Sequence, residues 1–567
     1  MIASGDDRNK RPMMRDVNET KSRWWLSALF SIVALLHLLP VWRVEYLPTV
    51  DGASHVYNAT VLRELTAGTP AFQGVYAADL RPYPNLLGHA FLWLALGVVP
   101  PVVAEKLLVS IIILLFLGGC WRLAGLVDPK SRVYALLAMP LTFHVLLQMG
   151  FYNYSLGAAI ALFAIASAWD ARGKNGWRPV AVTAFWLVLC YFGHALPAAV
   201  ALLFAMVIWA ISIGIRGWKS EWRQGVAFVP TIALLLWFAL QPKAPGGHWT
   251  WTGALMFEPL VRVAILLTFS LRQLTFGTAM GIAFGVLIAA TLALENFDWK
   301  RRRLIVRERD AFLLLTIFAI VLFLAAPLSV EEGLLLKARL LLFPYLICLP
   351  WLSPRLPRIL LAVVFAAVAL GNVYFMREWW KRSAKDLAVA TAPLSSVAPL
   401  HTVVALNLDH SSPHSLLPLF NHAVSYAFAE RRLIDLGNYE AAYGFFPVAF
   451  REGVRRPAII DVETHPGDFN PDAYADVLDY IYVWKMPAGA PLATRLAAHY
   501  NLVADGDDAK AGFLDLALDR AHGEEAQMRE IQDPSVPILE DAEEQSEADG
   551  DVGDVRHGEE EDAVARQ

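Results

Sequence analysis

The feature that most constrains the fold of this chain is a series of long apolar runs separated by short loops rich in Lys and Arg. Hydrophobic residues make up 56% of the 567 residues and charged residues only 18%, which is more apolar surface than a water-soluble protein needs. A helix needs about 20 apolar residues to cross a bilayer. Runs that are long enough to span, or nearly so, are 24–43, 103–121, 133–149, 153–170, 179–193, 195–215, 225–241, 275–296, 310–327, 337–352 and 358–376.

We therefore expect a polytopic α-helical membrane protein with 11 transmembrane helices, or 13 if the ambiguous runs 85–100 and 258–272 also span. The distribution of charge favours 11, because Lys and Arg concentrate in cytoplasmic loops. With 11 spans, all the basic loops lie on the side of the basic N-terminal segment 1–23. These loops contain Arg122/Lys130/Arg132, Arg172/Lys174/Arg178, Arg216/Lys219/Arg223, Lys300–Arg303 with Arg307 and Arg309, and Arg355/Arg358.

The composition changes after residue 376, which predicts two further parts. Residues 377–520 lack long apolar runs and contain short apolar segments such as "TVVALNL" and "YIYVWKM", which are typical of buried strands. We expect a small α/β domain outside the cytoplasm. Residues 521–567 contain 16 acidic and 3 basic residues, a net charge of −13, and this composition predicts a disordered acidic tail.

A candidate reactive group lies in the first outer loop, residues 44–102, which follows the first span of the transmembrane domain 24–376. The stretch "VDGASHVYNAT" places Asp51 and His55 four residues apart, so a helical segment would present both on one face. An Asp before a helix is also a common N-cap, and His55 and Asn58 could be hydrated loop residues. Asn58 and three other polar residues that we expect on the same side, His89, Tyr152 and Asn153, are candidates for a substrate pocket.

The stretch "PTVDGASHVYNA" resembles the first outer loop of the GT-C superfamily of membrane glycosyltransferases, including its aminoarabinose-, mannosyl- and Rgt-like bacterial branches. In that superfamily, an acidic residue directly after the first membrane helix acts as catalytic base or metal ligand in sugar transfer from a polyprenyl phosphate. The resemblance covers roughly residues 24–376 and implies this role for Asp51, which is followed here by Gly52. It implies a bacterial inner-membrane location and a possible divalent metal, held by Asp51 if at all.

Sugar transfer from a lipid phosphate needs a base for the acceptor and positive charge for the departing phosphate. In "EEGLLLKARLLLFPYL", Lys337 and Arg339 stand at the outer edge of a span. Basic residues at helix ends commonly extend to the interface, but these two lie on the side where positive charge is rare. We expect Arg339, with Lys337 beside it, to bind the donor phosphate and Glu331 and Glu332 to pair with them. His194, between two spans on the outer side, is a further substrate-pocket candidate.

The sequence thus favours an integral membrane glycosyltransferase that moves a sugar from a polyprenyl-phosphate donor to an extracytoplasmic glycan, lipid or protein. Asp51 would be the general base, and His55 would orient it or the acceptor. The partners expected are the bilayer, the donor and the acceptor, and no nucleic acid. The alternative is a non-enzymatic membrane protein, either a transporter or a scaffold for envelope assembly. Transporters tend to show related halves, and the sequence has no obvious internal symmetry.

Overall fold

The computed structural model describes residues 24–241, 249–250, 271–327, 329–330, 335–353, 356–487, 489–505 and 513–520. The chain divides into two compact units, Met1–Gly523 and Glu524–Gln567, and all described residues belong to the first. The predictions for the N-terminal segment 1–23, for most of the run 258–272, for Glu331 and Glu332, and for the acidic tail 521–567 lie outside the described residues.

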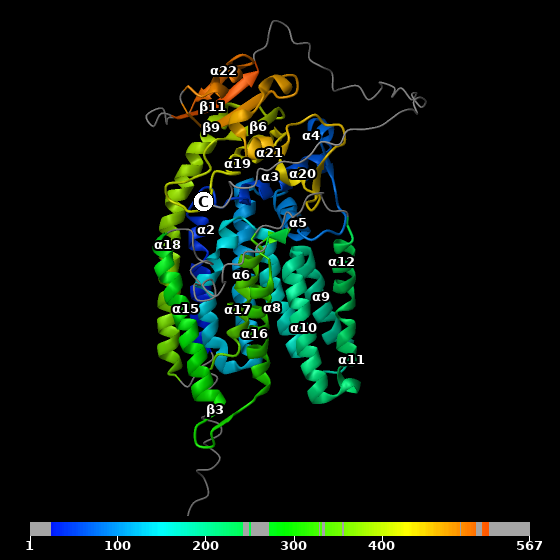
Figure 1. The fold of residues 1–567 in the computed structure, drawn as a ribbon, viewed down its shortest axis with the longest axis vertical. Coiled ribbons are helices and arrows are strands. Elements are labelled where there is room, and N and C mark those ends of the chain that lie inside the picture. Colours follow the sequence, from blue (N-terminus) through cyan, green and yellow to red (C-terminus); the bar gives the residue numbers. More distant parts are fainter. Residues whose placement is uncertain are drawn as a thin grey trace, which may run out of the picture. The chain divides into compact units, whose positions relative to one another are not determined.

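Helices make up most of the described part of the first unit (Figure 1). In the described part, six helices are long and apolar enough to cross a membrane, and a seventh candidate is the bent pair α11 (Trp218–Val226) and α12 (Val229–Ala239). The multi-pass character predicted from the sequence is therefore confirmed. The six are Trp24–Trp42, which ends in α2 (Leu39–Trp42); α6 (Pro101–Val127); α8 (Tyr152–Ala171); α10 (Ala195–Arg216); Thr275–Asn296, in which α15 (Leu271–Thr291) continues into η3 (Leu292–Asn296); and Arg358–Ser396, in which α18 (Arg358–Thr391) continues into η5 (Ala392–Ser396).

The predicted count of 11 spans is not confirmed, because several apolar runs form shorter or irregular elements. The run 133–149 forms η1 (Pro129–Ala138), η2 (Pro140–Phe143) and α7 (Val145–Gln148), since a proline lacks the N–H that a continuing helix needs. Its apolar residues are buried in protein, where irregular backbone is tolerated at membrane depth. Shorter helices take the place of other runs: α5 (Leu86–Ala95), α9 (Trp177–Gly193), α16 (Ala311–Ala325) and α17 (Leu336–Cys348).

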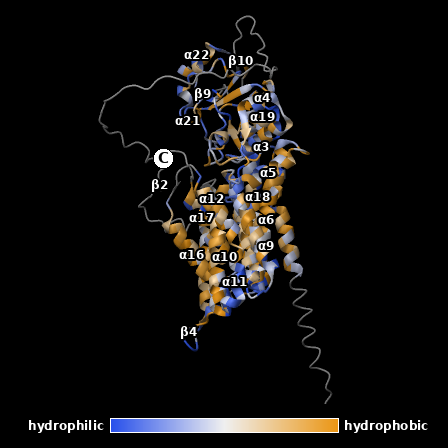
Figure 2. Ribbon diagram, turned by 90° about the vertical axis from the view of Figure 1, so that its right-hand side faces the viewer, coloured by the Kyte–Doolittle hydropathy of each residue, from blue (hydrophilic) through white to orange (hydrophobic). Residues whose placement is uncertain are grey.

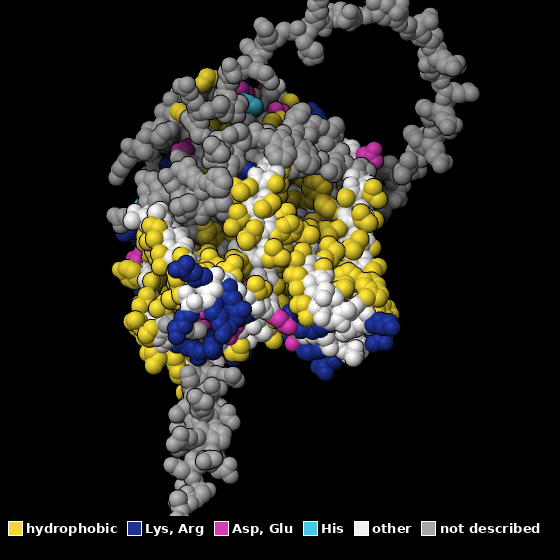
Figure 3. Space-filling model, turned by 60° about the horizontal axis from the view of Figure 1, so that its bottom comes forward, with side chains coloured by type: hydrophobic (Ala, Val, Ile, Leu, Met, Phe, Trp, Pro, Cys, Tyr) yellow, Lys and Arg dark blue, Asp and Glu magenta, His cyan; other side chains and the backbone are white. Residues whose placement is uncertain are grey.

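Apolar and basic surfaces are separated along the helices. Figure 2 shows hydrophobic residues along the long helices and hydrophilic ones at α11 and β4 (Arg303–Leu304). In Figure 3, Lys and Arg side chains gather at this end, below an apolar belt. The basic cluster Lys300–Arg303 is exposed here, next to β3 (Phe297–Asp298), which pairs with β4. Basic residues at one end of the helices are what the positive-inside rule describes.

A five-stranded sheet follows the last long helix, in the order β10-β11-β9-β6-β7. The central strand β6 (Thr402–Asn407) runs parallel to β7 (Ile434–Asp435) and β9 (Tyr480–Pro487), with Val403 opposite Tyr480. On the other side of β9, β11 (Phe513–Arg520) and β10 (Tyr500–Asp505) pair antiparallel. The helices of this region are α19 (Ser425–Arg431), α20 (Tyr439–Ala442), α21 (Ile459–Glu463) and α22 (Pro491–Ala497). The predicted boundary at residue 377 falls inside α18, which is one continuous helix.

The first outer loop and the sheet region pack as one body. The loop forms α3 (Gly52–Ala67), α4 (Pro70–Val75) and β1 (Tyr76–Ala78), and β1 pairs antiparallel with β8 (Val448–Phe450). The Tyr57 hydroxyl donates to the Leu433 carbonyl at 2.9 Å, and the buried Asn58 exchanges two side-chain hydrogen bonds with Asn438. Residues almost 400 positions apart in the chain therefore share one interior, and this interior holds Asp51.

Candidate active site

Asp51 occupies the N-cap position of α3, but its side chain makes no capping hydrogen bond. The helix-cap interpretation therefore does not account for its carboxylate. Backbone contacts hold the residue instead: the Asp51 N–H donates to the Met149 carbonyl, and the Val50 N–H donates to the Gln148 carbonyl, both at 3.1 Å. The turn before α8 thus positions the start of α3, and the Asp51 side chain is only 15% exposed.

Two glycines permit this close approach. A Cβ on Gly52 would lie 2.2 Å from Thr49 Oγ1, 2.4 Å from the Tyr152 hydroxyl and 2.5 Å from a Glu105 carboxylate oxygen. Gly150 has φ +80° and lies so close to the backbone of Asp51 that a Cβ there would approach it within 2.6 Å. The space that a second acidic side chain would need after Asp51 is therefore filled by other polar groups, which explains the Asp-Gly pair.

The surroundings of Asp51 favour its protonated form. Burial raises the pKa of its carboxyl well above the usual range, and the carboxylates of Glu440 and Glu463 raise it further, whereas the charge of Arg339 lowers it. His422 Nε2 lies 3.5 Å from Asp51 Oδ1, and burial lowers the pKa of His422 to about 3. Asp51 is thus a carboxyl group with raised basicity beside a neutral imidazole, and such a group is a candidate for proton transfer.

Beside Asp51, His55 and His89 enclose the fully buried Glu440. His55 Nδ1 lies 2.7 Å from Glu440 Oε1, and His89 Nε2 lies 3.0 Å from Glu440 Oε2. Burial alone would raise the pKa of Glu440, but the two imidazoles outweigh it and lower the pKa to about 2. Helices α3, α5 and α20 therefore meet at one ionised carboxylate.

The hydrogen bonds around this cluster favour a cation between its members. His89 Nδ1 lies 3.0 Å from the Asn85 carbonyl, and a carbonyl accepts only from N–H. A neutral His89 would then direct the lone pair of Nε2 at the Glu440 carboxylate, so either a second proton or a metal ion must separate them. Among the described residues, the buried His55 Nδ1 has no hydrogen-bond partner of good geometry, although Glu440 Oε1 lies only 2.7 Å away. An imidazole that donates its other N–H to a carbonyl is the usual second shell of a metal ligand.

His55, His89 and Glu440 form a candidate metal centre, since their ligand atoms all lie within 4.8 Å of one another. Two imidazoles and one carboxylate suit Zn²⁺ or another first-row transition metal. Asp51 is not a member of this group. The candidate metal ligands in the structure are therefore different from Asp51, the ligand that the resemblance implies. The prediction that His55 orients Asp51 or the acceptor stays a prediction, and its Nδ1 lies 2.7 Å from Glu440 Oε1.

Arg339 and His194 form a second polar pair near Asp51. His194 Nδ1 accepts from the Leu196 N–H at 3.1 Å, so the proton of the neutral ring is on Nε2. That Nε2 lies 3.3 Å from Arg339 Nη1, which is also a hydrogen-bond donor and cannot accept. Two donors that face each other need an acceptor between or beside them.

Aromatic side chains hold Arg339 in place. The guanidinium lies 4.7 Å from the centre of the Phe151 ring, and the Tyr154 hydroxyl donates to the Arg339 carbonyl. This arrangement is suited to binding an oxyanion.

The remaining predicted residues mostly support other side chains. Tyr152 donates to Glu105 at 2.6 Å. The Asn153 amide oxygen accepts from the Gly88 N–H at 2.9 Å, and its nitrogen lies 3.4 Å from His89 Nδ1. Asn58 is bonded to Asn438, as described above. Lys337 lies over the Phe323 ring at 5.8 Å, and its predicted phosphate contact stays a prediction.

Sequence reasoning missed Glu440, His422 and Glu463, which all lie in the part that was expected to be a separate domain. His422 and Glu463 line a small cavity of about 30 Å³ together with Asp435. A signal was present: "FNHAVSY" and "GNYEAAYGFF" place one ionisable residue among aromatic and small residues, which is typical of a buried charge. Nothing local to these segments indicates that they meet Asp51.

No family model and no curated protein matches this sequence. Solved structures that are similar to the chain include two of ArnT from Cupriavidus metallidurans. The one bound to undecaprenyl phosphate has a TM-score of 0.48 and 12% identity, and the apo state has a TM-score of 0.47 and 12% identity. Each alignment covers 88% of this chain and 98% of ArnT. A similarity at this level does not establish chemistry, for which the residues of the site are the evidence.

Proposed function

We propose that this chain is a membrane glycosyltransferase that transfers a sugar from a polyprenyl-phosphate donor to a glycan, lipid or protein outside the cytoplasm. The observation that carries the proposal is the placement of Asp51. Its carboxyl group has a raised pKa and is close enough to Arg339 for the guanidinium to lower that pKa in part. A base and an oxyanion site within reach of each other are what this reaction requires.

In the proposed reaction, ionised Asp51 accepts the proton of the acceptor hydroxyl as its oxygen attacks the anomeric carbon. The new C–O bond forms while the bond from that carbon to the phosphate oxygen breaks, so the configuration inverts. The lipid phosphate leaves with the electron pair, and Arg339 and His194 stabilise its negative charge. Lys337 is proposed as an additional cation for this phosphate. The raised pKa of Asp51 makes its ionised form a stronger base than an exposed Asp.

His55, His89 and Glu440 would hold a divalent cation in this proposal. Bound there, the metal would supply positive charge beside Asp51 and favour its ionised form. The role of these three residues is to fix α3, α5 and α20 around the base. Asn153 supports the cluster by accepting from the N–H of Gly88, the residue before His89, and Asn58 supports it through Asn438, the residue that precedes α20.

The rival function is that of a transporter or scaffold without catalysis. Transporters place ionisable residues near the bilayer midplane, on broken helices. Here Asp51, His55 and His89 lie on the loop between the spans Trp24–Trp42 and Pro101–Val127, where they can meet soluble acceptors. This placement favours chemistry at the membrane surface. The proposal includes an inner-membrane location with this surface facing away from the cytoplasm.

Asp51→Asn tests the proposal, because it keeps the shape of the side chain and removes the proton acceptor. We expect transfer to fall about 100-fold or more, the usual scale for a lost general base. The assay measures release of polyprenyl phosphate by the full chain in proteoliposomes, with a panel of polyprenyl-phosphate hexoses and pentoses and membrane glycolipid as acceptor.

Asp79→Asn is the matched control, since Asp79 lies in the same loop and pairs with Arg81 at the surface. It should leave turnover unchanged. Normal turnover in Asp51→Asn, with activity present in the unmodified chain, would disprove the role of the base. Lack of any turnover in the unmodified chain across the panel would favour the non-enzymatic alternative.

A further inference from the structure

A second polar site lies at the opposite end of α6 from the candidate active site. Glu105, near the start of this helix, contacts Tyr152, whereas Asp128 follows its last residue. Asp128 lies 23 positions after Glu105, which at 1.5 Å per residue separates the two sites by about 35 Å. At the far end is a cavity of about 490 Å³, within the range of roughly 300–1,000 Å³ that is typical of ligand pockets.

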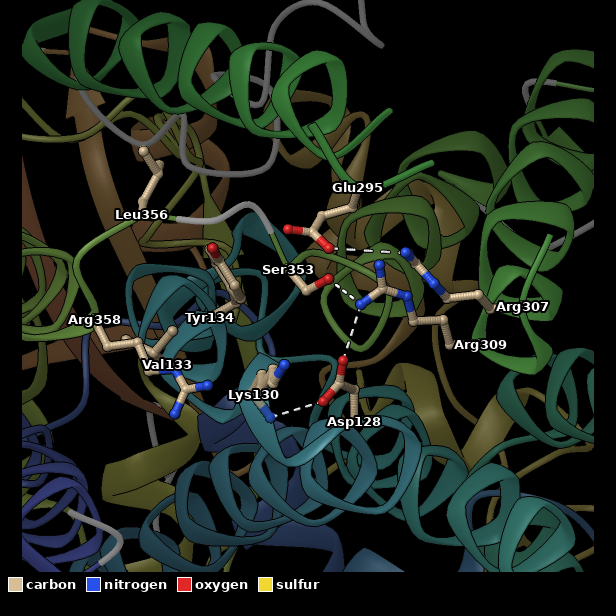
Figure 4. A pocket seen from close by; sticks show the side chains of 10 residues that line it. All are labelled: Asp128, Lys130, Val133, Tyr134, Glu295, Arg307, Arg309, Ser353, Leu356 and Arg358. Carbon is tan, nitrogen blue, oxygen red and sulfur yellow. Dashed lines mark hydrogen bonds and ion pairs between the residues drawn. The ribbon is translucent and has the colours of Figure 1, made fainter. Parts of the chain in front are cut away.

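Figure 4 shows that side chains from several segments surround this cavity. Four are cationic and two are anionic, so the formal charge of the lining is +2. The cationic residues are Lys130, Arg307, Arg309 and Arg358, the anionic residues are Asp128 and Glu295, and Val133, Tyr134, Ser353 and Leu356 complete the lining. A cavity with excess positive charge favours an anionic ligand.

The Arg309 guanidinium has donors that no described residue satisfies. Nη1 donates to Asp128 Oδ2 at 2.9 Å and to the Ser353 hydroxyl. Its Nε and Nη2 have no hydrogen-bond partner among the described residues. Both atoms are buried, and the whole residue is only 8% exposed, so bulk water does not satisfy these donors either. Unsatisfied buried donors are costly, and a planar guanidinium with two unsatisfied nitrogen donors on one edge matches the oxygens of a phosphate.

The pocket is preformed by contacts that do not involve a ligand. Asp310 accepts from the Arg307 N–H at 2.6 Å, from Asn296 at 2.8 Å and from the Trp351 indole at 2.8 Å. These bonds fix the turn η4 (Glu308–Asp310) that carries Arg309. Arg307 is held less firmly, since its Nη1 lies 3.9 Å from Glu295. The cation that is most buried is therefore the one that is best positioned.

From this geometry, we propose that the cavity binds the phosphate group of a membrane lipid. Phosphate is the shared chemistry of a lipid headgroup and of a soluble phosphate. The position favours the lipid, because the lining comes from the ends of α6, η3 and α18, where apolar helices reach the level of the headgroups. Val133 and Leu356 add apolar contacts that suit the start of a lipid tail. This proposal is independent of the proposed catalytic function.

The test is a binding titration of the purified full chain in neutral detergent, with melting temperature and a binding isotherm as readouts. The probes are dihexanoyl-phosphatidic acid, dihexanoyl-phosphatidylcholine and inorganic pyrophosphate. The variant Lys130→Gln/Arg358→Gln removes two exposed cations of the lining. Its control, Arg122→Gln/Arg178→Gln, removes two exposed cations that do not line the cavity.

We expect phosphatidic acid to bind most tightly and the first variant to weaken it about five-fold for each cation removed, as expected for about 1 kcal/mol per basic residue. The control should bind as the unmodified chain does. Equal weakening in the control would overturn the site, as would equal binding of phosphatidylcholine. Pyrophosphate binding at least as tight as phosphatidic acid, with the same dependence on Lys130 and Arg358, would overturn the lipid as the source.

Discussion

At the residue scale, Gly52 shows how little room the candidate site has. Gly52→Ala would place a methyl group within 2.5 Å of three polar oxygens, so either the backbone of Asp51 or the Tyr152–Glu105 hydrogen bond must shift. We expect a loss of about 1–3 kcal/mol in stability, measured as a lower melting temperature, and a loss of turnover. Gly74→Ala is the control, because a Cβ there meets nothing within 4 Å. Equal melting temperatures for the two variants would contradict the packing described here.

Asp435 gives a pH-dependent prediction at the same scale. Burial raises the pKa of this carboxyl from 3.8 to about 7, although the Gly437 N–H partly opposes the shift. A carboxyl whose pKa is higher in the folded state lowers stability as pH rises from about 4 to about 7. Asp435→Asn should therefore raise the melting temperature at pH 8 relative to the unmodified chain and change it little at pH 4. A benefit that is the same at both pH values would show that ionisation is not the cause.

At the element scale, the candidate metal centre joins α3 and α5 to α20, which follows them by about 350 residues in the chain. A bound metal stabilises the folded state by about 2.7 kcal/mol at a concentration 100 times its Kd. Chelation should therefore lower the melting temperature of the full chain, and Zn²⁺ should restore it with about one equivalent bound. Metal content and melting temperature are the measurements.

His89→Ala should abolish this response, whereas His499→Ala should keep it, since His499 pairs with Asp472 away from the cluster. His89→Cys offers a spectroscopic check, because a thiolate ligand adds a charge-transfer band when Co²⁺ is bound. A chain that retains no metal and melts at the same temperature with and without chelator would show that protons alone link the two imidazoles to Glu440.

At the scale of the whole molecule, topology decides whether the two polar sites face different compartments. We predict that the basic loops lie in the cytoplasm and that residues 377–520 lie outside, because all five basic clusters then share one side. Reporter fusions after residues 175 and 380 should report opposite sides. The same accessibility at both positions would refute the assignment and would remove the argument for an extracytoplasmic acceptor.

Much of this protein could be predicted from local sequence. Long apolar runs identify membrane helices because hydrophobicity acts on each segment separately, and six of the runs appear as helices of sufficient length. The acid in the first outer loop is recognisable by its place in the chain. The count of spans was less predictable, since the buried run 133–149 and the runs that form long helices are both strongly apolar, and only the surrounding protein distinguishes them.

The partners of Asp51 were decided by tertiary structure alone. Glu440, His422 and Glu463 reach the first outer loop because β1 pairs with β8 and Asn58 pairs with Asn438. Hydrophobic periodicity and turn residues act over a few positions and contain no information about such a contact. The raised pKa of Asp51 and the charge of the His55–His89–Glu440 cluster arise from burial and from neighbours distant in sequence. The sequence by itself determined a membrane protein with an acid in the loop after its first span, and only the tertiary structure decided what surrounds that acid.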